Sequence, residues 1–95
     1  MTDASHAGDL CSAVLTEHAS KQMARRQVGQ AQVRDVLRAP ERVLDVRAGR
    51  IVVQGVQSFG GREYLLRVFL DVDRRPPEVV TVYRTSKIDK YRRRP

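Results

Sequence analysis

Apolar residues recur at every third or fourth position in the first forty residues and at every second position after Pro40. The first spacing is that of one helix face, and the second is that of one strand face. The pattern predicts helices over about residues 17–27 and 30–38. Their apolar positions are Leu15, Ala19 and Met23 for the first helix and Val33, Val36 and Leu37 for the second.

Residues at the expected helix ends support these limits. Thr16 is a suitable N-cap for the first helix, and Gly29 can begin the second, where Gln32 occupies the third position of a capping box. Pro40 ends the second helix because it disfavours helical geometry at the preceding residue and donates no amide hydrogen.

Four runs rich in β-branched and aromatic residues follow, at residues 41–47, 51–59, 63–72 and 78–85. Short turn-forming segments separate them, which predicts an antiparallel meander. The last stretch, SKIDKYRRRP, opens with a possible Ser86 cap and indicates a short terminal helix. The expected fold is α+β, with two N-terminal helices packed on one face of a four-stranded antiparallel meander sheet and a short C-terminal helix. Residues 1–13 are expected to be a flexible leader, and residues 14–95 a single domain with a basic C-terminal tail.

Strand alternation assigns side chains to the two faces of this sheet. In the third strand, the set beginning at Tyr64 and including Leu66 and Val68 is expected in the core. In the fourth strand, Val80 and Val82 are expected in the core, and Val79, Thr81, Tyr83 and Thr85 on the other face. Arg67, Tyr83 and Thr85 are therefore expected to converge on a face that stays partly open.

The chain has 95 residues and a net charge of +7, which favours a polyanionic partner such as nucleic acid. Six basic residues and one acidic residue lie between Arg84 and Pro95, so this tail holds most of the excess charge. The alternative is a solvated terminus that keeps a small protein soluble. A single cysteine excludes an internal disulfide, and no apolar run is long enough to cross a bilayer. Because the N-terminal residues do not resemble a secretory signal, a cytoplasmic location is expected.

Arg67 stands between Leu66 and Val68 in a strand, where a charge is unusual. It is a candidate phosphate clamp because the guanidinium fork matches phosphate oxygens. The alternative is an arginine that lies over apolar surface and pairs with Asp71.

His18 is the only histidine inside a predicted element, and imidazole gains and loses a proton near neutral pH. It is a candidate catalytic base or acid, although a lone helical histidine more often packs or caps. The segment YRTSK, Tyr83 to Lys87, gathers polar groups where a strand passes into a helix start, and its alternative is an ordinary solvated strand end.

The motifs of several function classes are missing from the sequence. There is no GxxxxGK[ST] or GxGxxG segment, and no HxH or HExxH spacing, so neither nucleotide nor metal binding is favoured and no cofactor is expected. The DxD match at Asp71–Asp73 runs into a turn and is interpreted as loop polarity.

Five segments in order, TEHASKQM, VRDVLRAPERV, a glycine-containing turn, GGREYLLRVFLD and VVTVYRTSKIDKY, resemble the bacterial family called domain of unknown function 4258, over about residues 14–92. That family is similar to the BrnT and RelE-type toxins, which are small basic α+β proteins that cut RNA without metal and are neutralised by an antitoxin. The resemblance implies a RelE/barnase-like arrangement. The sequence departs from the pattern of that family at two positions. Gln22 stands where arginine is usual, and Gly29 stands where serine or threonine is usual. The catalytic residues that the resemblance implies are His18, Arg67, Tyr83, Arg84, Thr85 and Lys87.

The leading hypothesis is a toxin-like, metal-independent endoribonuclease of a toxin–antitoxin pair, in which a 2′-hydroxyl attacks the adjacent phosphate. His18 would act as base or acid with Tyr83 or Lys87 as its counterpart, while Arg67 and Arg84 stabilise phosphate charge. The expected RNA-binding residues are Lys21, Arg25, Lys90, Tyr91, Arg92 and Arg93. The alternative is a non-catalytic RNA-binding or antitoxin-partner module, and a DNA-binding regulator is a weaker third interpretation.

Overall fold

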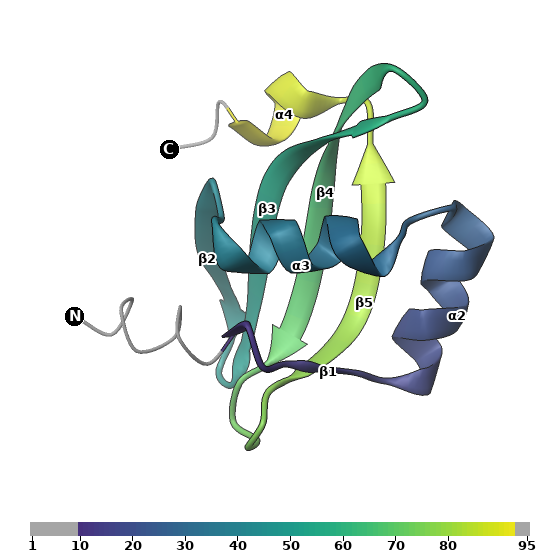
Figure 1. The fold of residues 1–95 in the computed structure, drawn as a ribbon. Coiled ribbons are helices and arrows are strands. Elements are labelled where there is room, and N and C mark those ends of the chain that lie inside the picture. Colours follow the sequence, from purple (N-terminus) through teal and green to yellow (C-terminus); the bar gives the residue numbers. More distant parts are fainter. Residues whose placement is uncertain (1–9, 93–95) are drawn as a thin grey trace.

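The computed structural model describes residues 10–92, with the side chain of Arg92 excepted. It contains a five-stranded sheet in the order β1-β5-β4-β3-β2 (Figure 1). The bounds of the strands are β1 Val14–Leu15, β2 Arg42–Arg47, β3 Arg50–Phe59, β4 Arg62–Asp71 and β5 Glu78–Thr85. The antiparallel meander of β2 to β5 is confirmed, but the four-stranded antiparallel sheet is wrong in one respect: β1 adds a fifth strand, parallel to β5. A strand of two residues is too short to show a periodic pattern of apolar residues, so β1 could not be predicted from the sequence pattern.

Two helices precede the meander, α2 (Glu17–Arg26) and α3 (Gln30–Arg38), close to their predicted limits. The Thr16 hydroxyl accepts a hydrogen bond from the Ala19 amide at 3.1 Å and so caps α2. At the start of α3, the Gln32 side chain accepts from the Gly29 amide at 2.9 Å. Glycine has no side chain to return the bond, so only this half of a capping box forms.

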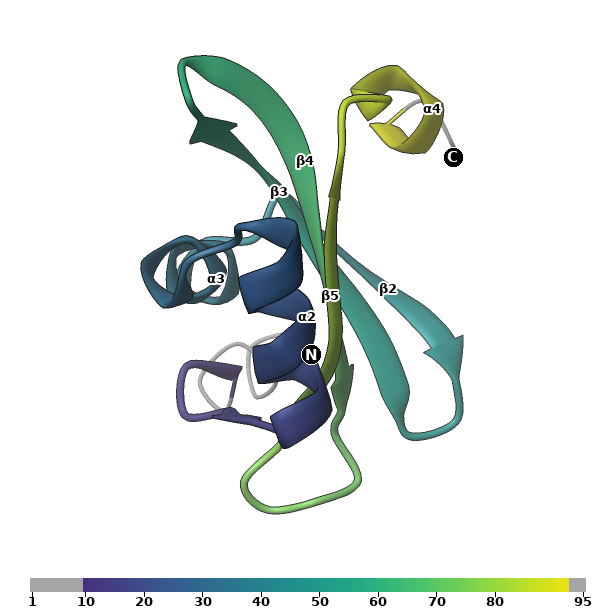
Figure 2. The same ribbon diagram turned by 90° about the vertical axis from the view of Figure 1, so that its right-hand side faces the viewer.

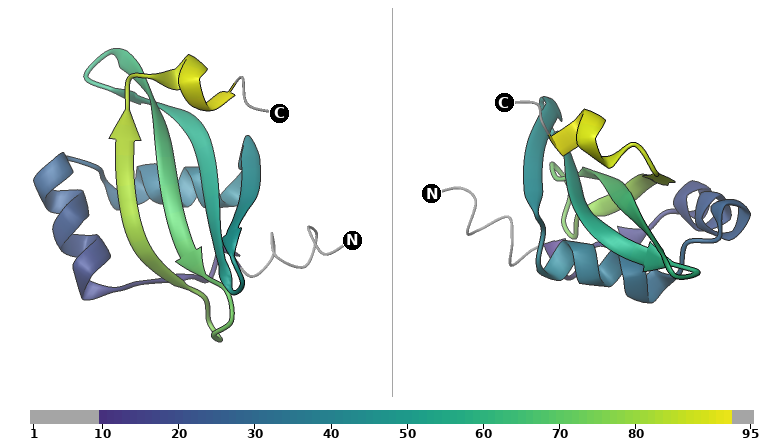
Figure 3. Two further views of the ribbon diagram at one scale, coloured as in Figure 1. Left: turned by 180° about the vertical axis from the view of Figure 1, so that it is seen from behind. Right: turned by 90° about the horizontal axis from the view of Figure 1, so that it is seen from above.

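The helices lie on both sides of the sheet, not on one. Figure 2 shows α2 and α3 on one side and the short α4 (Ile88–Arg92) on the other. α3 crosses over β3 and β4, whereas α2 runs beside β5 (Figure 3). We call the two sides the α3 face and the α4 face. The α4 face, expected to stay partly open, holds the fully buried Leu65 and the nearly buried Val52.

The main core lies between the α3 face and the helices. It includes Ala19 and Met23 from α2, the three inward residues of α3, and alternate residues of the central strands. Leu10 and Ala13 also belong to it, with exposed fractions of 1% and 2%. The packed part of the chain therefore includes residues before the boundary expected at residue 14. Residues 1–9 of the expected leader lie outside the described residues.

A β-bulge in β5 corrects one assignment of the strand faces. Leu70 pairs with Val79 and Phe69 pairs with Thr81, so Val80 is an extra residue without a partner in β4. As a result Val79 is fully buried in the core and Val80 is only half-buried, the reverse of the prediction. Beyond the bulge, Val82 faces the core and Tyr83 the α4 face, as predicted.

Side chains of α2 cover the edge of β5 that β1 leaves unpaired. The Val82 amide donates to the Gln22 side chain at 2.9 Å, and Arg26 donates to the Val82 carbonyl at 2.8 Å. These two bonds occupy both backbone groups of Val82, which are then not available for pairing with another strand. Gln22 therefore has a structural role here.

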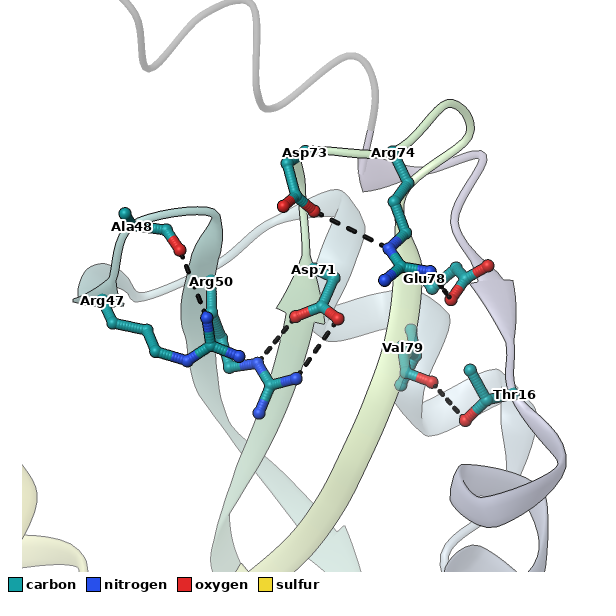
Figure 4. A network of polar contacts seen from close by, with 9 residues as sticks. All are labelled: Thr16, Arg47, Ala48, Arg50, Asp71, Asp73, Arg74, Glu78 and Val79. Carbon is teal, nitrogen blue, oxygen red and sulfur yellow. Dashed lines mark hydrogen bonds and ion pairs between the residues drawn. The ribbon is translucent and has the colours of Figure 1, made fainter.

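Three acidic residues lie at the end of the sheet near the β2–β3 hairpin (Figure 4): Asp71 at the end of β4, Asp73 in the following loop and Glu78 at the start of β5. Asp71 receives two hydrogen bonds from Arg50, at 2.6 and 3.2 Å, and these bonds hold the pKa of the Asp71 carboxyl below its usual range. Arg74 lies between Asp73 and Glu78. The DxD segment is thus engaged in ion pairs with arginines.

Within residues 10–92, no helix combines the length and the hydrophobicity that a membrane crossing requires.

Candidate functional site

A row of polar residues crosses the α4 face, one residue from each of four neighbouring strands. Arg42 of β2 is opposite Gln54 of β3, Gln54 is opposite Arg67 of β4, and Arg67 is opposite Tyr83 of β5. We call these four residues the Arg67 row. The predicted convergence of Arg67 and Tyr83 on one face is confirmed. Thr85 belongs to the same face, opposite Leu65.

The guanidinium of Arg67 is held by neutral groups. Its Nε donates to Gln54 Oε1 at 3.0 Å, and Nη1 donates to the Tyr83 hydroxyl at 2.7 Å. The Tyr91 ring of α4 lies 4.4 Å from the guanidinium carbon, and Phe69 and Tyr83 lie at 5.5 and 5.8 Å. The proposed pairing with Asp71 is wrong, because Asp71 binds Arg50. No carboxylate of the described residues pairs with Arg67, so its charge is not neutralised locally.

Gln54 is a site residue that the sequence analysis missed. It is fully buried, and its Nε2 has no hydrogen-bond partner among the described residues. An unsatisfied buried donor beside an unneutralised cation is costly. Both features suit a negatively charged or oxygen-rich ligand. The signal available in the sequence was a glutamine within the apolar run of the second predicted strand.

Tyr83 keeps its proton over a wide pH range. Burial raises the pKa of its phenol, hydrogen bonding with Tyr91 raises it further, and the hydrogen bond from Arg67 opposes the shift. At neutral pH the phenol is therefore a proton donor rather than a base.

Arg84 does not join Arg67, contrary to the grouping of the YRTSK segment into one catalytic cluster. It is opposite Leu66 and so lies on the α3 face. Its guanidinium carbon is 4.4 Å from the Phe59 ring centre and 4.6 Å from that of Tyr64. The two rings meet edge to face at 5.5 Å.

The end of the YRTSK segment forms a local turn. The Thr85 hydroxyl accepts from the Lys87 amide at 3.1 Å, and the Lys87 side chain is exposed. Lys90 lies over the Tyr91 ring at 5.5 Å. The side chain of Arg92 and all of Arg93 lie outside the described residues.

Two of the three predicted residues of α2, His18 and Lys21, form no hydrogen bond or ion pair with the Arg67 row among the described residues, whereas Arg25 lies near its Tyr83 end. The His18 side chain is exposed and makes no hydrogen bond or ion pair with a described residue. Lys21 pairs with Glu17 at 3.4 Å on the helix surface. Arg25 is exposed at the other end of the helix, where it lines a cavity with Tyr83 and Arg84. Arg25, alone of these three, is shown to share a site with a strand residue.

No group of three or more His, Cys, Asp or Glu side chains that could hold a metal ion occurs in the described part of the chain.

The model of one protein family matches residues 15–84, most of the chain. The chain belongs to the DUF4258 family, described as a domain of unknown function. The match covers β1 to β5 apart from the first and last residues, and so includes the Arg67 row of this DUF4258 domain. No curated protein and no solved structure matches the chain.

Proposed function

We propose that this DUF4258 protein is a toxin-like endoribonuclease that cleaves single-stranded RNA without a metal ion. The observation that supports this most is the unneutralised guanidinium of Arg67, fixed by Gln54 and Tyr83 and stacked on Tyr91. A fixed guanidinium can bind the scissile phosphate and stabilise the extra negative charge that develops on its oxygens.

In the proposed reaction the 2′-hydroxyl attacks the adjacent phosphorus and the bond to the 5′-oxygen breaks, which leaves a 2′,3′-cyclic phosphate and a 5′-hydroxyl. Tyr83 is the proposed general acid, because its phenol is protonated at neutral pH and lies beside Arg67. His18 remains the proposed base for the 2′-hydroxyl, on the exposed surface of α2.

RNA bases can stack on the aromatic groups of the α4 face, and the basic residues of α2 and the C-terminal segment can attract the RNA backbone. Lys90 and Tyr91 are the described members of that C-terminal group. An antitoxin protein is the second proposed partner, and an acidic segment would complement the same basic surface.

The decisive experiment incubates purified protein with fluorescent single-stranded RNA in EDTA and follows cleavage on a gel. We expect cleavage by the wild type and by Arg47→Ala, an exposed arginine at the β2–β3 hairpin. We expect a loss of about 100-fold or more for Arg67→Ala and His18→Ala, the scale of an electrostatic or acid–base contribution. Intact RNA at high protein excess, with binding retained, would falsify the catalytic proposal.

A second candidate function, a non-catalytic RNA-binding or antitoxin-partner module, is favoured by one observation. The exposed His18 makes no described contact with Arg67 or Tyr83, so no base is seen in place beside the phosphate site. Under this alternative Arg67→Ala weakens RNA binding in a salt-dependent way, and no variant changes a cleavage rate.

A further inference from the structure

A cavity of about 480 Å³ lies at the edge of β5, away from the Gln54 side of the Arg67 row. Its lining residues are Arg25, Arg26, Gln27, Tyr83 and Arg84. A second hollow, of about 370 Å³, shares Gln27 and Arg84 with it and continues along Phe59 and Tyr64. We call the first of these the Arg84 cavity.

Three arginines, Arg25, Arg26 and Arg84, line the Arg84 cavity, and no acidic residue is among its lining residues. Arg26 is fixed by its hydrogen bond to the Val82 carbonyl, and Arg84 by its position over two aromatic rings. Neither partner carries a charge, and no described carboxylate forms an ion pair with Arg25, Arg26 or Arg84. By contrast Arg50 and Arg74, near the β2–β3 hairpin, pair with acids. Positive charge is thus left uncompensated at this end of the sheet.

Tyr83 connects the Arg84 cavity to the Arg67 row. Its hydroxyl accepts a hydrogen bond from Arg67, and Tyr83 is also one of the residues that line the cavity. The Arg67 row and the Arg84 cavity therefore share Tyr83, at the edge of β5. A flexible polyanion held at Arg67 can continue around this edge into the cavity.

We propose that the Arg84 cavity binds a second phosphodiester of the RNA strand whose scissile phosphate lies at Arg67. The inference rests on the proposed function and adds a path for the substrate, from the α4 face across Tyr83 to Arg25, Arg26 and Arg84. Guanidinium groups suit this ligand because their forked donors bind phosphate oxygens. The cavity contributes affinity for longer strands and takes no part in bond cleavage.

The test measures the affinity of the full chain for 2′-O-methyl RNA, which cannot be cleaved by 2′-hydroxyl attack. Fluorescence anisotropy compares labelled strands of three and eight nucleotides over a range of salt concentrations. Arg25→Ala is the main variant because the Arg25 side chain is exposed and forms no hydrogen bond or ion pair with another described residue. Arg47→Ala is the control with the same change of charge, on the far hairpin.

We expect Arg25→Ala to weaken binding of the eight-nucleotide strand about fivefold and to reduce the slope of log affinity against log salt by about 0.7, the value for one phosphate on a single strand. Its affinity for the three-nucleotide strand should match that of Arg47→Ala. Arg84→Met, checked for an unchanged unfolding midpoint, should show the same dependence on length.

Equal affinity of Arg25→Ala and Arg47→Ala for the long strand would overturn the cavity proposal, as would an equal loss for both strand lengths. Cleavage of unmodified RNA by the same proteins is scored separately. Normal cleavage without a length effect would leave the ribonuclease proposal standing and remove the cavity proposal. A dependence of affinity on strand length without any cleavage would remove the ribonuclease proposal and leave the cavity as a binding site for the RNA backbone. Binding of an acidic peptide but of neither RNA strand would overturn the cavity proposal in favour of a protein ligand.

Discussion

Tyr83 and Arg84 are neighbours in the chain but serve opposite faces of the sheet. The Tyr83 hydroxyl contacts Arg67 on the α4 face, whereas the Arg84 guanidinium covers Phe59 and Tyr64 on the α3 face. Substitutions at the two positions should therefore affect different properties. The Tyr83 variants report on chemistry, and the Arg84 variants on the binding of longer strands.

Tyr83→Phe keeps the ring and removes only the hydroxyl. We expect cleavage to fall about 100-fold, because the proposed general acid is lost. The free energy of unfolding should fall by about 1 kcal/mol, because Arg67 loses an acceptor. Gel-based rates and urea unfolding measure both effects, with Tyr64→Phe on the α3 face as the control. Wild-type cleavage by Tyr83→Phe would rule out its role as the acid.

The raised pKa of Tyr83 can be observed directly by following phenolate absorbance with pH. One of the three tyrosines should titrate above the ordinary value near 10, and Tyr83→Phe should lose that late step. Since the folded state favours the protonated phenol, this group stabilises the fold below the unfolded-state pKa. That contribution disappears as pH rises through the folded-state pKa. A late step that persists in Tyr83→Phe would assign it to another tyrosine.

Gln54→Glu places a carboxylate where Oε1 now accepts from Arg67 Nε at 3.0 Å. The new group would neutralise Arg67 and remove the unpartnered donor, so RNA affinity should fall about tenfold while the unfolding midpoint at pH 7 stays equal or rises. Gln57→Glu makes the same change of charge on the other face of β3 and should cost less affinity. Fluorescence anisotropy measures the RNA affinity of each variant, and thermal unfolding measures its midpoint. Equal affinities for the two variants would show that the charge of Arg67 is not what holds RNA.

Gln22→Ala removes the acceptor of the Val82 amide, which lies in the buried contact between α2 and β5. We expect a loss of about 1–3 kcal/mol in the free energy of unfolding, because the amide is left without a partner. Gln22→Glu keeps an acceptor for the Val82 amide, so its free energy of unfolding should fall by less than that of Gln22→Ala. Urea unfolding of both variants tests this, and an Ala variant as stable as the wild type would show that the bond contributes little.

Asp71→Asn should lower stability by about 1 kcal/mol at pH 7, a small value because the Arg50–Asp71 pair is partly exposed. The hydrogen bonds from Arg50 depress the pKa of Asp71, so this stability is present above the unfolded-state pKa and is lost as pH falls through the folded-state pKa. The difference between variant and wild type should therefore shrink in acid. Asp35→Asn, in a more exposed pair with Arg38, should cost less at every pH.

Local patterns predicted most of the fold. The change of period at Pro40 separated two helices from four strands, and the polar caps placed the helix starts within a residue. Two features depend on tertiary contacts instead. β1 forms only because Val14 and Leu15 meet β5, and the bulge at Val80 is hidden in a run of β-branched residues that fits either face.

The candidate site was predicted in part. Alternation alone placed Arg67 and Tyr83 on one face, and the same alternation already implied that Arg84 points to the other. Arg84 was nevertheless grouped with Tyr83 because the two residues are adjacent in the chain. Gln54 was missed because its importance depends on the register of β3 against β4, which the sequence does not specify.

Because Val80 has no partner in β4, the residues before it and after it keep their faces of the sheet whether or not Val80 is present. Removing it would restore a regular ladder in which Val79 still faces the core and Tyr83 still faces Arg67. Family members can therefore differ by one residue in length here and still place the residue at position 83 opposite Arg67. In an alignment of such relatives, a one-residue gap opposite Val80 would be a conservative change, whereas a one-residue gap opposite Val82 would turn the Tyr83 phenol to the α3 face.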